Sequence, residues 1–391
     1  MVDTIIIGAG VSGLMAGQIL KEKNILILEK MPSAGKKLLL TGGGRCNLTN
    51  LKSIPSFLQE VNYNNKFLYS TLHTFGPQEI YDFFNPIVPL KTEKEDQIFP
   101  ISNRSKDILN VLLDGLDHKI HYDETVHHIQ VMEDGYQIKT TRGHYNAKHI
   151  IIACGGASFS TTGSAGDHMY FAKSLGLDSV PLFPAETSIL LSHPPKVVAT
   201  SFQNAKVSFD KHIAHGNLIF THKGLSGTSI MKLSETIYLK QIKEIFIDFN
   251  TQLEEETIRL AFQENREGKP SIILSSFFTR KFSDYLCAKA GIDETCRSKH
   301  LVHKQINLLI ELIKNHRYEI LGCEVLEKAY VTGGGISIKE VNPKTFETKK
   351  HKNLYIVGES LDIHGPIGGY NITLALSSGY SAANAILNQL D

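Results

Sequence analysis

The sequence predicts an α/β protein in which a doubly wound, Rossmann-like domain is interrupted by an inserted β-barrel plus helical domain. Three observations support this prediction. The N-terminal segment contains a strand, a glycine-rich turn, a helix and a second strand. Two later apolar strands, near Ile150 and Leu354, also end in glycine-rich turns. From about residue 188 to residue 321 such turns become rare. We therefore expect 1–187 and 322–391 to build one domain and 188–321 to form the insert.

The N-terminal segment DTIIIGAGVSGLMAGQILKEKNILILEK has the pattern of a dinucleotide-binding unit. Thr4–Ile7 is a β-branched apolar run, as expected of a buried parallel strand, and NILILE supplies the second strand. Gly8 would make the tight turn, Gly10 would let a pyrophosphate reach the main chain, and Gly13 would let helix and strand pack closely. Glu29 lies where a carboxylate accepts both hydroxyls of an adenosine ribose. That carboxylate would repel a 2′-phosphate, so the site suits FAD or NAD rather than NADP.

The stretch GKKLLLTGGGRCNLTN predicts a second backbone surface against the same cofactor. Its glycine triplet, 42–44, is entropically costly, which indicates that something approaches the main chain closely. Lys36, Lys37 and Arg45 could offset phosphate charge, and Asn47 could hydrogen-bond carbonyl and ring-nitrogen groups. FAD often needs such a second arm, because its isoalloxazine lies far from its adenine, whereas NAD does not. A flexible loop with a chance basic pair is the alternative.

Two further glycine-rich turns complete the predicted cofactor edge. After a predicted β-meander, an apolar strand runs into Gly155-Gly156 and would return the chain to the cofactor sheet. Near the C-terminus, strand Leu354–Val357 is followed by another glycine-rich turn, which opens onto a helix beginning near Tyr370. The N-terminus of that helix would suit the electron-rich end of a reduced flavin, and Asp362 could hold a polyol hydroxyl.

Four segments together resemble the aminoacetone-oxidase-like or bile-acid-reductase-like family of NAD(P)/FAD-dependent oxidoreductases. They are GAGVSGLMAG, GKKLLLTGGGRCNLTN, ACGGASFSTTGSAGDHMYFAKSLG with FTHKGLSG, and VTGGGISIKEVNPKTFETK with LYIVGESLDIHGPIGGYN. The resemblance spans the chain, and the GGGRCNLTN and EVNPKT blocks are distinctive. It implies a bipartite FAD domain of the glutathione-reductase-like two-dinucleotide-binding superfamily, with non-covalent FAD. Thr228 departs from the family pattern, in which proline usually follows GLSG, and this affects only the expected shape of that loop.

By position, the resemblance implies a set of FAD contacts spread over these segments, with Val126 contributing its main chain to the adenine. The contacts are Gly8, Gly10, Ser12, Gly13, Glu29, Lys30, Lys37, Gly42, Gly43, Gly44, Arg45, Cys46, Asn47, Val126, Gly155, Gly358, Glu359, Asp362, Gly369, Tyr370 and Asn371.

Three residues are candidates for catalytic proton handling near the flavin ring. His364 lies inside the flavin turn, Tyr370 follows it, and His222 lies between a strand and a glycine turn. A structural histidine is the alternative for His222, and a contribution of the backbone alone is the alternative for Tyr370. Cys46 adjoins the triplet, but no second cysteine is close in sequence, so a disulfide role is not expected. No metal site is predicted, because the five cysteines show no C-x-x-C spacing.

The bulk composition is that of an ordinary soluble protein, with 42% hydrophobic and 21% charged residues and a net charge of +1. Such a charge creates no global field for nucleic acid or anionic lipid, and no run approaches the ~18 apolar residues of a membrane helix. No signal-like segment is found at the N-terminus. We expect a cytoplasmic protein that acts on a small molecule, with neither nucleic acid nor membrane as partner. The oligomeric state is left open.

A second strand-GxGxxG-helix unit is not found, since the nearest segment, YVTGGGISI, lacks the spacing. Either the substrate itself reduces the flavin, as in an oxidase of aminoacetone or another small amine, or NAD(P)H binds transiently and the enzyme reduces an unsaturated ketone-type acceptor. A non-catalytic flavin redox sensor is a third possibility. The insert would cover the flavin and shape a substrate pocket, although a dimer surface is its alternative role. We expect a FAD-dependent oxidoreductase.

Overall fold

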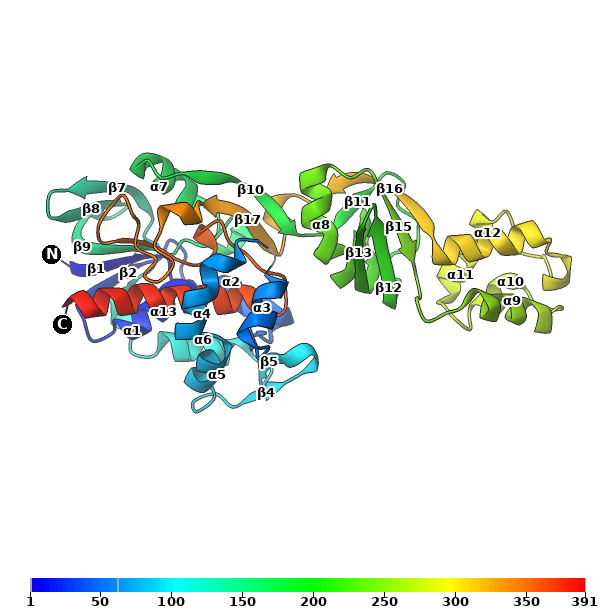
Figure 1. Cartoon of the computed structure of the whole chain (residues 1–391), viewed down its shortest axis with the longest axis horizontal. Coiled ribbons are helices and arrows are strands. Elements are labelled where there is room, and N and C mark those ends of the chain that lie inside the picture. The colour runs from blue at the N-terminus through cyan, green and yellow to red at the C-terminus, as the bar shows by residue number, and fades with distance from the viewer. Residues whose placement is uncertain (1, 62, 391) are drawn as a thin grey trace. The chain divides into compact units, whose positions relative to one another are not determined.

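The computed structural model describes residues 2–61 and 63–390, and these divide into two compact units (Figure 1). Unit 1 holds the chain up to Phe183 and from Leu326 onward, and unit 2 holds Pro184–Val325. The boundary predicted after residue 187 precedes strand β11 (Ile189–Leu191), and the one predicted after residue 321 falls inside β16 (His316–Cys323). The division into 1–187 with 322–391 and 188–321 stays a prediction about independently folding domains.

Unit 1 is built on a parallel sheet of the predicted doubly wound type. In spatial order its strands are β6 (Ile120–His121), β2 (Ile25–Leu28), β1 (Val2–Ile7), β9 (Gly143–Ile152) and β18 (Leu354–Ile356). The central strand β1 pairs in parallel with β2 and β9, so that Ile5 lies beside Leu26 on one side and Ile150 on the other. All three residues are buried, which explains why these strands are continuous apolar runs.

Strand β9 joins this parallel sheet to the predicted β-meander. Its first half pairs antiparallel with β8 (Gly135–Thr140), which in turn pairs with β7 (Val126–Met132). Its second half lies between β1 and β18 and runs parallel to both. The sequence indicated two strands here, one in the meander and one returning to the cofactor sheet. In the structure, the single strand β9 takes both places.

Unit 1 also contains α-helices from both of its chain segments. They are α1 (Val11–Ile19), α2 (Lys36–Leu40), α3 (Ile54–Glu60), α4 (Tyr69–Thr74), α5 (Pro77–Phe84), α6 (Ser105–Leu113), α7 (Asp167–Leu175) and α13 (Tyr370–Leu390). Helix α13 runs alongside α1 (Figure 1). A Cβ atom on Gly379 of α13 would lie 2.2 Å from the Ser12 carbonyl oxygen of α1, so only glycine permits this approach. The C-terminal helix is thus fixed against the N-terminal one.

Two smaller sheets complete unit 1. One consists of β3 (Thr49–Asn50), β5 (Gln97–Pro100) and β4 (Leu90–Thr92), and the other of β17 (Val331–Ile336) and β10 (Ser179–Glu186), of which the residues up to Phe183 belong to unit 1. The glycines of YVTGGGISI lie in β17. A Cβ atom on Gly333 would lie 2.2 Å from the ring of Phe183, and one on Gly334 would lie 2.3 Å from the Pro181 carbonyl oxygen. These glycines therefore serve close packing of β10 on β17.

Unit 2 contains a closed six-stranded barrel, as predicted for the insert. In order around the barrel the strands are β11, β14 (Gly224–Ser226), β13 (His212–Phe220), β12 (Ser201–Phe209), β15 (Glu244–Asp248) and β16. Its helices are α8 (Thr228–Lys240), α9 (Glu255–Glu264), α10 (Pro270–Leu274), α11 (Arg280–Lys289) and α12 (His303–Lys314).

The core of unit 2 joins barrel and helices through aromatic rings. Phe249 packs against Phe202 of β12 and Phe282 of α11, with ring centroids 4.7 Å apart in both pairs. Helices α9 to α12 gather at one end of the barrel (Figure 1). In neither unit does the described part of the chain include a helix long and apolar enough to cross a lipid bilayer.

Candidate functional site

Four of the predicted cofactor segments meet at one edge of the parallel sheet. Gly8 follows β1, Glu29 follows β2, Gly155 comes shortly after β9, and Gly358 comes shortly after β18. Because these strands are adjacent and parallel, their carboxyl ends lie at the same edge. In open α/β sheets, ligands bind in the crevice outside this edge.

The first glycine turn combines two tightly packed glycines with one open one. Gly8 has φ +106°, and a Cβ atom there would lie 2.5 Å from the Ala153 carbonyl oxygen. A Cβ atom on Gly13 would lie 2.0 Å from the Gly8 carbonyl oxygen. Around the Cβ position of Gly10, by contrast, no heavy atom lies within 4 Å. The main chain of Gly10 is therefore open to a ligand at the N-terminus of α1, where free N–H groups favour a diphosphate.

Glu29 closes this turn with its own carboxylate. Its Oε2 atom accepts a hydrogen bond from the N–H of Ala9 at 2.7 Å, and its Oε1 atom accepts one from the N–H of Met31 at 2.8 Å. Burial raises the pKa of Glu29, and these two hydrogen bonds act against that rise. Each oxygen keeps a further lone pair for a hydroxyl group. The predicted contact with ribose hydroxyls stays a prediction and is compatible with this geometry.

The glycine triplet adopts a backbone that favours glycine. Gly42, Gly43 and Gly44 have φ values of +57°, +68° and +88°, all in the left-handed region. Cys46 shares this conformation with φ +63°, and its buried thiol has a pKa raised to about 12 by burial. A thiol with so high a pKa is not a reactive thiolate at neutral pH.

The predicted second FAD-binding segment, residues 35–50 (called the arm below), is hydrogen-bonded to the first glycine turn and contains an unpaired acceptor near its end. The N–H of Gly35, just before α2, donates to the carbonyl oxygen of Ala9 at 2.9 Å. After the triplet, the Oδ1 atom of Asn47 is buried and has no hydrogen-bond partner in the described part of the chain. An unpaired buried acceptor costs about 1–3 kcal/mol, so a ligand N–H at this place would satisfy it. The open main chain of Gly10 and this orphaned oxygen both fit the predicted FAD.

Lys37 and Glu359 form a network that the sequence did not indicate. The Nζ atom of Lys37 lies 2.6 Å from Oε2 of Glu359 and 2.7 Å from Oγ of Ser158. The same carboxylate accepts hydrogen bonds from the N–H groups of Thr332 at 2.9 Å and Gly156 at 3.3 Å. Burial would raise the pKa of Glu359, but the charge of Lys37 and these hydrogen bonds hold it below its usual value. Glu359 thereby connects the arm, the turn after β9 and β17.

Arg45, predicted to offset phosphate charge, and Lys30, an implied FAD contact, also have carboxylate partners. Arg45 pairs with Glu93 and lies over the ring of Phe99, with its guanidinium carbon 4.3 Å from the centroid. Lys30 pairs with Asp167 at the start of α7. The predicted contacts of Lys30, Lys37 and Arg45 with FAD stay predictions, but the chain itself already balances the charge of each.

The loop after β18 gathers polar and aromatic side chains around Asp362. Its Oδ2 atom accepts a hydrogen bond from the Tyr63 hydroxyl at 2.9 Å, and its carbonyl oxygen accepts one from the Asn64 amide at 2.6 Å. The Tyr63 ring stacks on His364 with centroids 5.1 Å apart, and Phe183 meets the imidazole edge-on at 6.0 Å. Sequence reasoning missed Tyr63, because its segment VNYNNK has neither periodicity nor a motif.

At the start of α13, the side chains of Tyr370 and Asn371 already contact other groups of the chain. Tyr370 is buried with its ring centroid 4.6 Å from that of Phe57, and burial raises the pKa of its phenol. The Asn371 side chain accepts from the N–H of Gly365 at 2.9 Å and donates to its carbonyl oxygen at 2.7 Å. Gly369 has φ +94°. Contacts of these residues with FAD would therefore come from the main chain more readily than from the side chains.

Three remaining predicted residues have simple locations. Ser12 is buried in α1, and Val126 is the half-buried first residue of β7. His222 belongs to unit 2, where it is exposed in the turn between β13 and β14. Of the three catalytic candidates, His364 and Tyr370 lie in the loop and helix start after β18, close to the carboxyl edge of the unit 1 sheet.

His168, in the first turn of α7, is a buried polar group that the sequence did not single out. It is fully buried, and neither ring nitrogen has a partner in the part of the chain that the structure describes. Burial lowers its pKa to about 4, against the opposing influence of Glu359 and Asp167. The imidazole is therefore neutral in the folded protein above that pH.

Replacing His168 by leucine is expected to flatten the acid dependence of stability. Between the unfolded pKa of about 6.5 and the folded value of about 4, the unfolded state binds more protons, so wild-type stability falls as the pH falls. Between about pH 7 and pH 5 this group alone accounts for about 2 kcal/mol. Urea unfolding of both apoproteins at the two pH values measures the effect. An unchanged pH dependence in the variant would contradict it.

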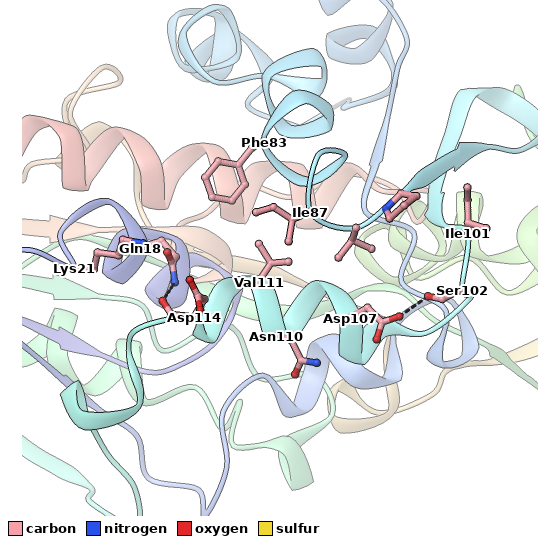
Figure 2. Close-up of a pocket in the computed structure, with 12 residues that line it drawn as sticks. Gln18, Lys21, Phe83, Ile87, Ile101, Ser102, Asp107, Asn110, Val111 and Asp114 are labelled. Carbon is pink, nitrogen blue, oxygen red and sulfur yellow. Dashed lines mark hydrogen bonds between the residues drawn. The ribbon is translucent and has the colours of Figure 1, made fainter.

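A separate groove of about 870 Å³ lies on the α6 side of unit 1. Figure 2 shows Asp107, Asn110 and Val111 of α6 and Asp114 just after it along the groove, opposite Phe83 and Ile87. The complete lining is Gln18, Lys21, Phe83, Ile87, Val88, Pro89, Ile101, Ser102, Asp107, Asn110, Val111 and Asp114. None of these is a predicted site residue, so the groove is distinct from the carboxyl edge of the sheet.

Known proteins share both the sequence pattern and the fold. A family model described as HI0933-like protein Rossmann domain matches residues 2–385. The chain is 28% identical to the 3-dehydro-bile acid delta(4,6)-reductase of Clostridium scindens, over 97% of this chain and 98% of that protein. It is 27% identical to the ribosomal RNA dihydrouridine synthase of Haemophilus influenzae, over 99% of each chain.

A solved structure extends the likeness to the fold. The 3-ketosteroid delta1-dehydrogenase from Sterolibacterium denitrificans superposes with a TM-score of 0.55 over 99% of both chains, at 11% sequence identity. At this identity the match concerns the fold alone, and it agrees with the α/β architecture described above.

Proposed function

Because the chain belongs to the HI0933-like Rossmann-domain family of FAD-dependent oxidoreductases, we propose that it is a reductase of a carbon–carbon double bond conjugated with a carbonyl group. The observation that carries this proposal is the length of the two alignments. Both the bile acid reductase and the dihydrouridine synthase align over nearly the whole chain, unit 2 included. A delta(4,6)-reductase of a 3-dehydro bile acid and a synthase of dihydrouridine both add two hydrogens to such a bond. The shared step is a hydride to the β carbon and a proton to the α carbon.

When bound, FAD would take a hydride from NAD(P)H and pass it to the acceptor. In this proposal the Gly8–Gly13 turn and the N-terminus of α1 hold the diphosphate, and Glu29 holds the adenosine ribose. Gly42–Gly44 and Asn47 would lie against the flavin ring. The open face of Gly10 and the unpaired Oδ1 atom of Asn47 support this assignment.

His364 is the residue that we propose to hold the proton. An imidazole can donate a proton near neutral pH, and this one lies in the loop that follows β18. Tyr370 suits the role less well, because its phenol packs against Phe57 and its raised pKa makes proton release harder. His222 is exposed at a turn of unit 2.

For the acceptor we place a small unsaturated ketone first. A net charge of +1 provides little of the phosphate neutralisation on which RNA binding depends. A uridine of ribosomal RNA is the second candidate, because a relative that aligns over 99% of its length is named a ribosomal RNA dihydrouridine synthase. Oxidation of aminoacetone stays a prediction of the resemblance, and it requires that the amine itself reduce the flavin.

Anaerobic mixing separates these functions. The FAD-loaded protein is mixed in turn with NADH, NADPH and aminoacetone while the visible absorbance of the flavin is followed. We expect bleaching by a pyridine nucleotide, then recovery of the colour on adding a 3-oxo-4-ene steroid, with a product two hydrogens heavier. A His364→Gln protein should bleach normally and recover slowly.

Two other outcomes are informative. Recovery with protein-free ribosomal RNA and not with the steroid would favour the second candidate and correct the expectation that nucleic acid is no partner. Bleaching by aminoacetone alone, followed by peroxide in air, would contradict the reductase and support the oxidase.

A further inference from the structure

We infer that Tyr63 is a positioning residue for His364, an inference that rests on the function proposed above. Tyr63 and His364 are far apart in sequence, and the fold stacks their rings nearly parallel, with an interplanar angle of 25°. The Tyr63 hydroxyl donates a hydrogen bond to the Asp362 carboxylate, and the Tyr63 ring stacks on the His364 imidazole. This arrangement sets the plane of the proposed proton donor.

The carboxylate that holds Tyr63 is itself fixed. Asp362 is only 4% exposed, and its N–H donates to the Ile336 carbonyl oxygen of β17 at 2.8 Å. Its Oδ2 atom accepts from the Tyr63 hydroxyl at 2.9 Å. Asn64 has φ +56°, and its side-chain amide donates a second hydrogen bond to Asp362, this one to the main-chain carbonyl oxygen. The segment carrying the phenol is therefore attached to the loop after β18 at two points.

The imidazole is confined on a second side. Phe183 meets His364 edge-on, with an interplanar angle of 82° and centroids 6.0 Å apart. The Phe183 ring in turn lies on the main chain of Gly333, where a Cβ atom would be 2.2 Å from it. His364 is thus held between a ring face and a ring edge, and both rings are anchored to β17 or the loop after β18.

Such confinement matters for proton transfer. A general acid must lie within hydrogen-bond reach of the accepting atom, and a displacement of about 1 Å can lower the rate about 100-fold. Stacking on the phenol face opposes rotation of the imidazole about its Cβ–Cγ bond. Removing the phenol ring should therefore misplace the proton donor without removing it.

The test compares Tyr63→Leu, Tyr63→Phe and a matched control, Tyr69→Leu, which breaks a surface Tyr69–His73 ring pair with centroids 4.3 Å apart. We expect Tyr63→Leu to slow flavin reoxidation by the acceptor about 10- to 100-fold, with FAD content and reduction by NAD(P)H unchanged. Tyr63→Phe keeps the stack and should lose less than about 5-fold. The control should match the wild type.

A double variant distinguishes positioning from an independent effect. Once His364 is glutamine, removing Tyr63 should cost nothing further, because both changes act on one step. Additive losses in Tyr63→Leu/His364→Gln, or a wild-type rate in Tyr63→Leu, would overturn the inference.

A measurement without turnover keeps the inference separate from the proposed function. In proton NMR spectra, the Tyr63 ring current should shift the His364 Cε1–H resonance of the wild type, and the shift should persist in Tyr63→Phe and vanish in Tyr63→Leu. If no acceptor reoxidises the wild-type flavin, the proposed function fails while this shift still supports the stack. A resonance unchanged in Tyr63→Leu overturns the positioning role.

Discussion

Replacing Gly10 by alanine is expected to weaken FAD binding by about 100-fold or more while the apoprotein stays folded. Gly10 has φ −82° and ψ −174°, an extended conformation that alanine adopts readily, and its Cβ position has no heavy atom within 4 Å. In the apoprotein the added methyl group therefore meets only open space. When FAD binds, the same methyl group would occupy the place of the diphosphate.

Gly13→Ala is the matched comparison, because the same added methyl group meets the main chain instead. Its Cβ atom would lie 2.0 Å from the Gly8 carbonyl oxygen, so helix α1 would have to move away from β1. We expect this variant to lose about 2–4 kcal/mol of unfolding free energy and to lose FAD binding as a consequence. Gly10→Ala should lose less than about 1 kcal/mol.

Two measurements on each apoprotein decide the matter: urea unfolding for stability and titration with FAD for affinity. Gly10→Ala should separate the two properties and Gly13→Ala should lower both. Wild-type FAD affinity in a well-folded Gly10→Ala protein would show that the diphosphate does not lie against this turn.

The second large effect is expected at the ion pair of Lys37 and Glu359. Lys37→Met leaves the Glu359 carboxylate with backbone donors but without a counter-ion. Removing one partner of a fully buried pair costs about 3–5 kcal/mol, and because these side chains are 28% and 18% exposed we expect about 2 kcal/mol. In the double variant Lys37→Met/Glu359→Gln no charge remains unpaired, so part of the loss should be recovered. Urea unfolding of the two single variants and the double variant measures the coupling.

The same pair makes a prediction for acid. The pKa of Glu359 is lowered in the folded protein, so its contribution to stability is present above the unfolded value of about 4.3 and is lost as the pH falls through the folded value. Glu359→Gln should lack this loss. A Lys37→Met protein as stable as the wild type at neutral pH, or equal acid dependence in Glu359→Gln and wild type, would contradict the role assigned to the pair.

Local patterns in the sequence were sufficient for the family, the doubly wound sheet, the inserted barrel and the class of FAD-dependent oxidoreductase, all of which are confirmed. The family and the oxidoreductase class follow from the resemblance of four segments, whereas the strands and turns of the sheet are visible in short-range patterns. A glycine at Gly13 is required by contact with a residue five positions earlier, and the run Ile5–Ile7 is apolar because both faces of its strand are covered. The individual FAD contacts and the domain bounds stay predictions.

What depends on distant contacts could not be derived in this way. Lys37 lies beside the glycine triplet in sequence, yet its counter-ion is Glu359, 322 residues away. Tyr63 lies in a segment without a motif, and its inferred role depends on its contacts with Asp362 and His364.

The sequence by itself therefore determined the strands of the parallel sheet and the glycine turns that follow them, because strand burial and turn formation are visible in residue type and local pattern. Tertiary structure decided which charges neutralise each other, why Gly333 is a packing residue, and which ring orients the proposed proton donor. Those outcomes depend on how β18, β17 and the start of α13 return to the N-terminal sheet, because side-chain pairing follows distance in space and not position along the chain.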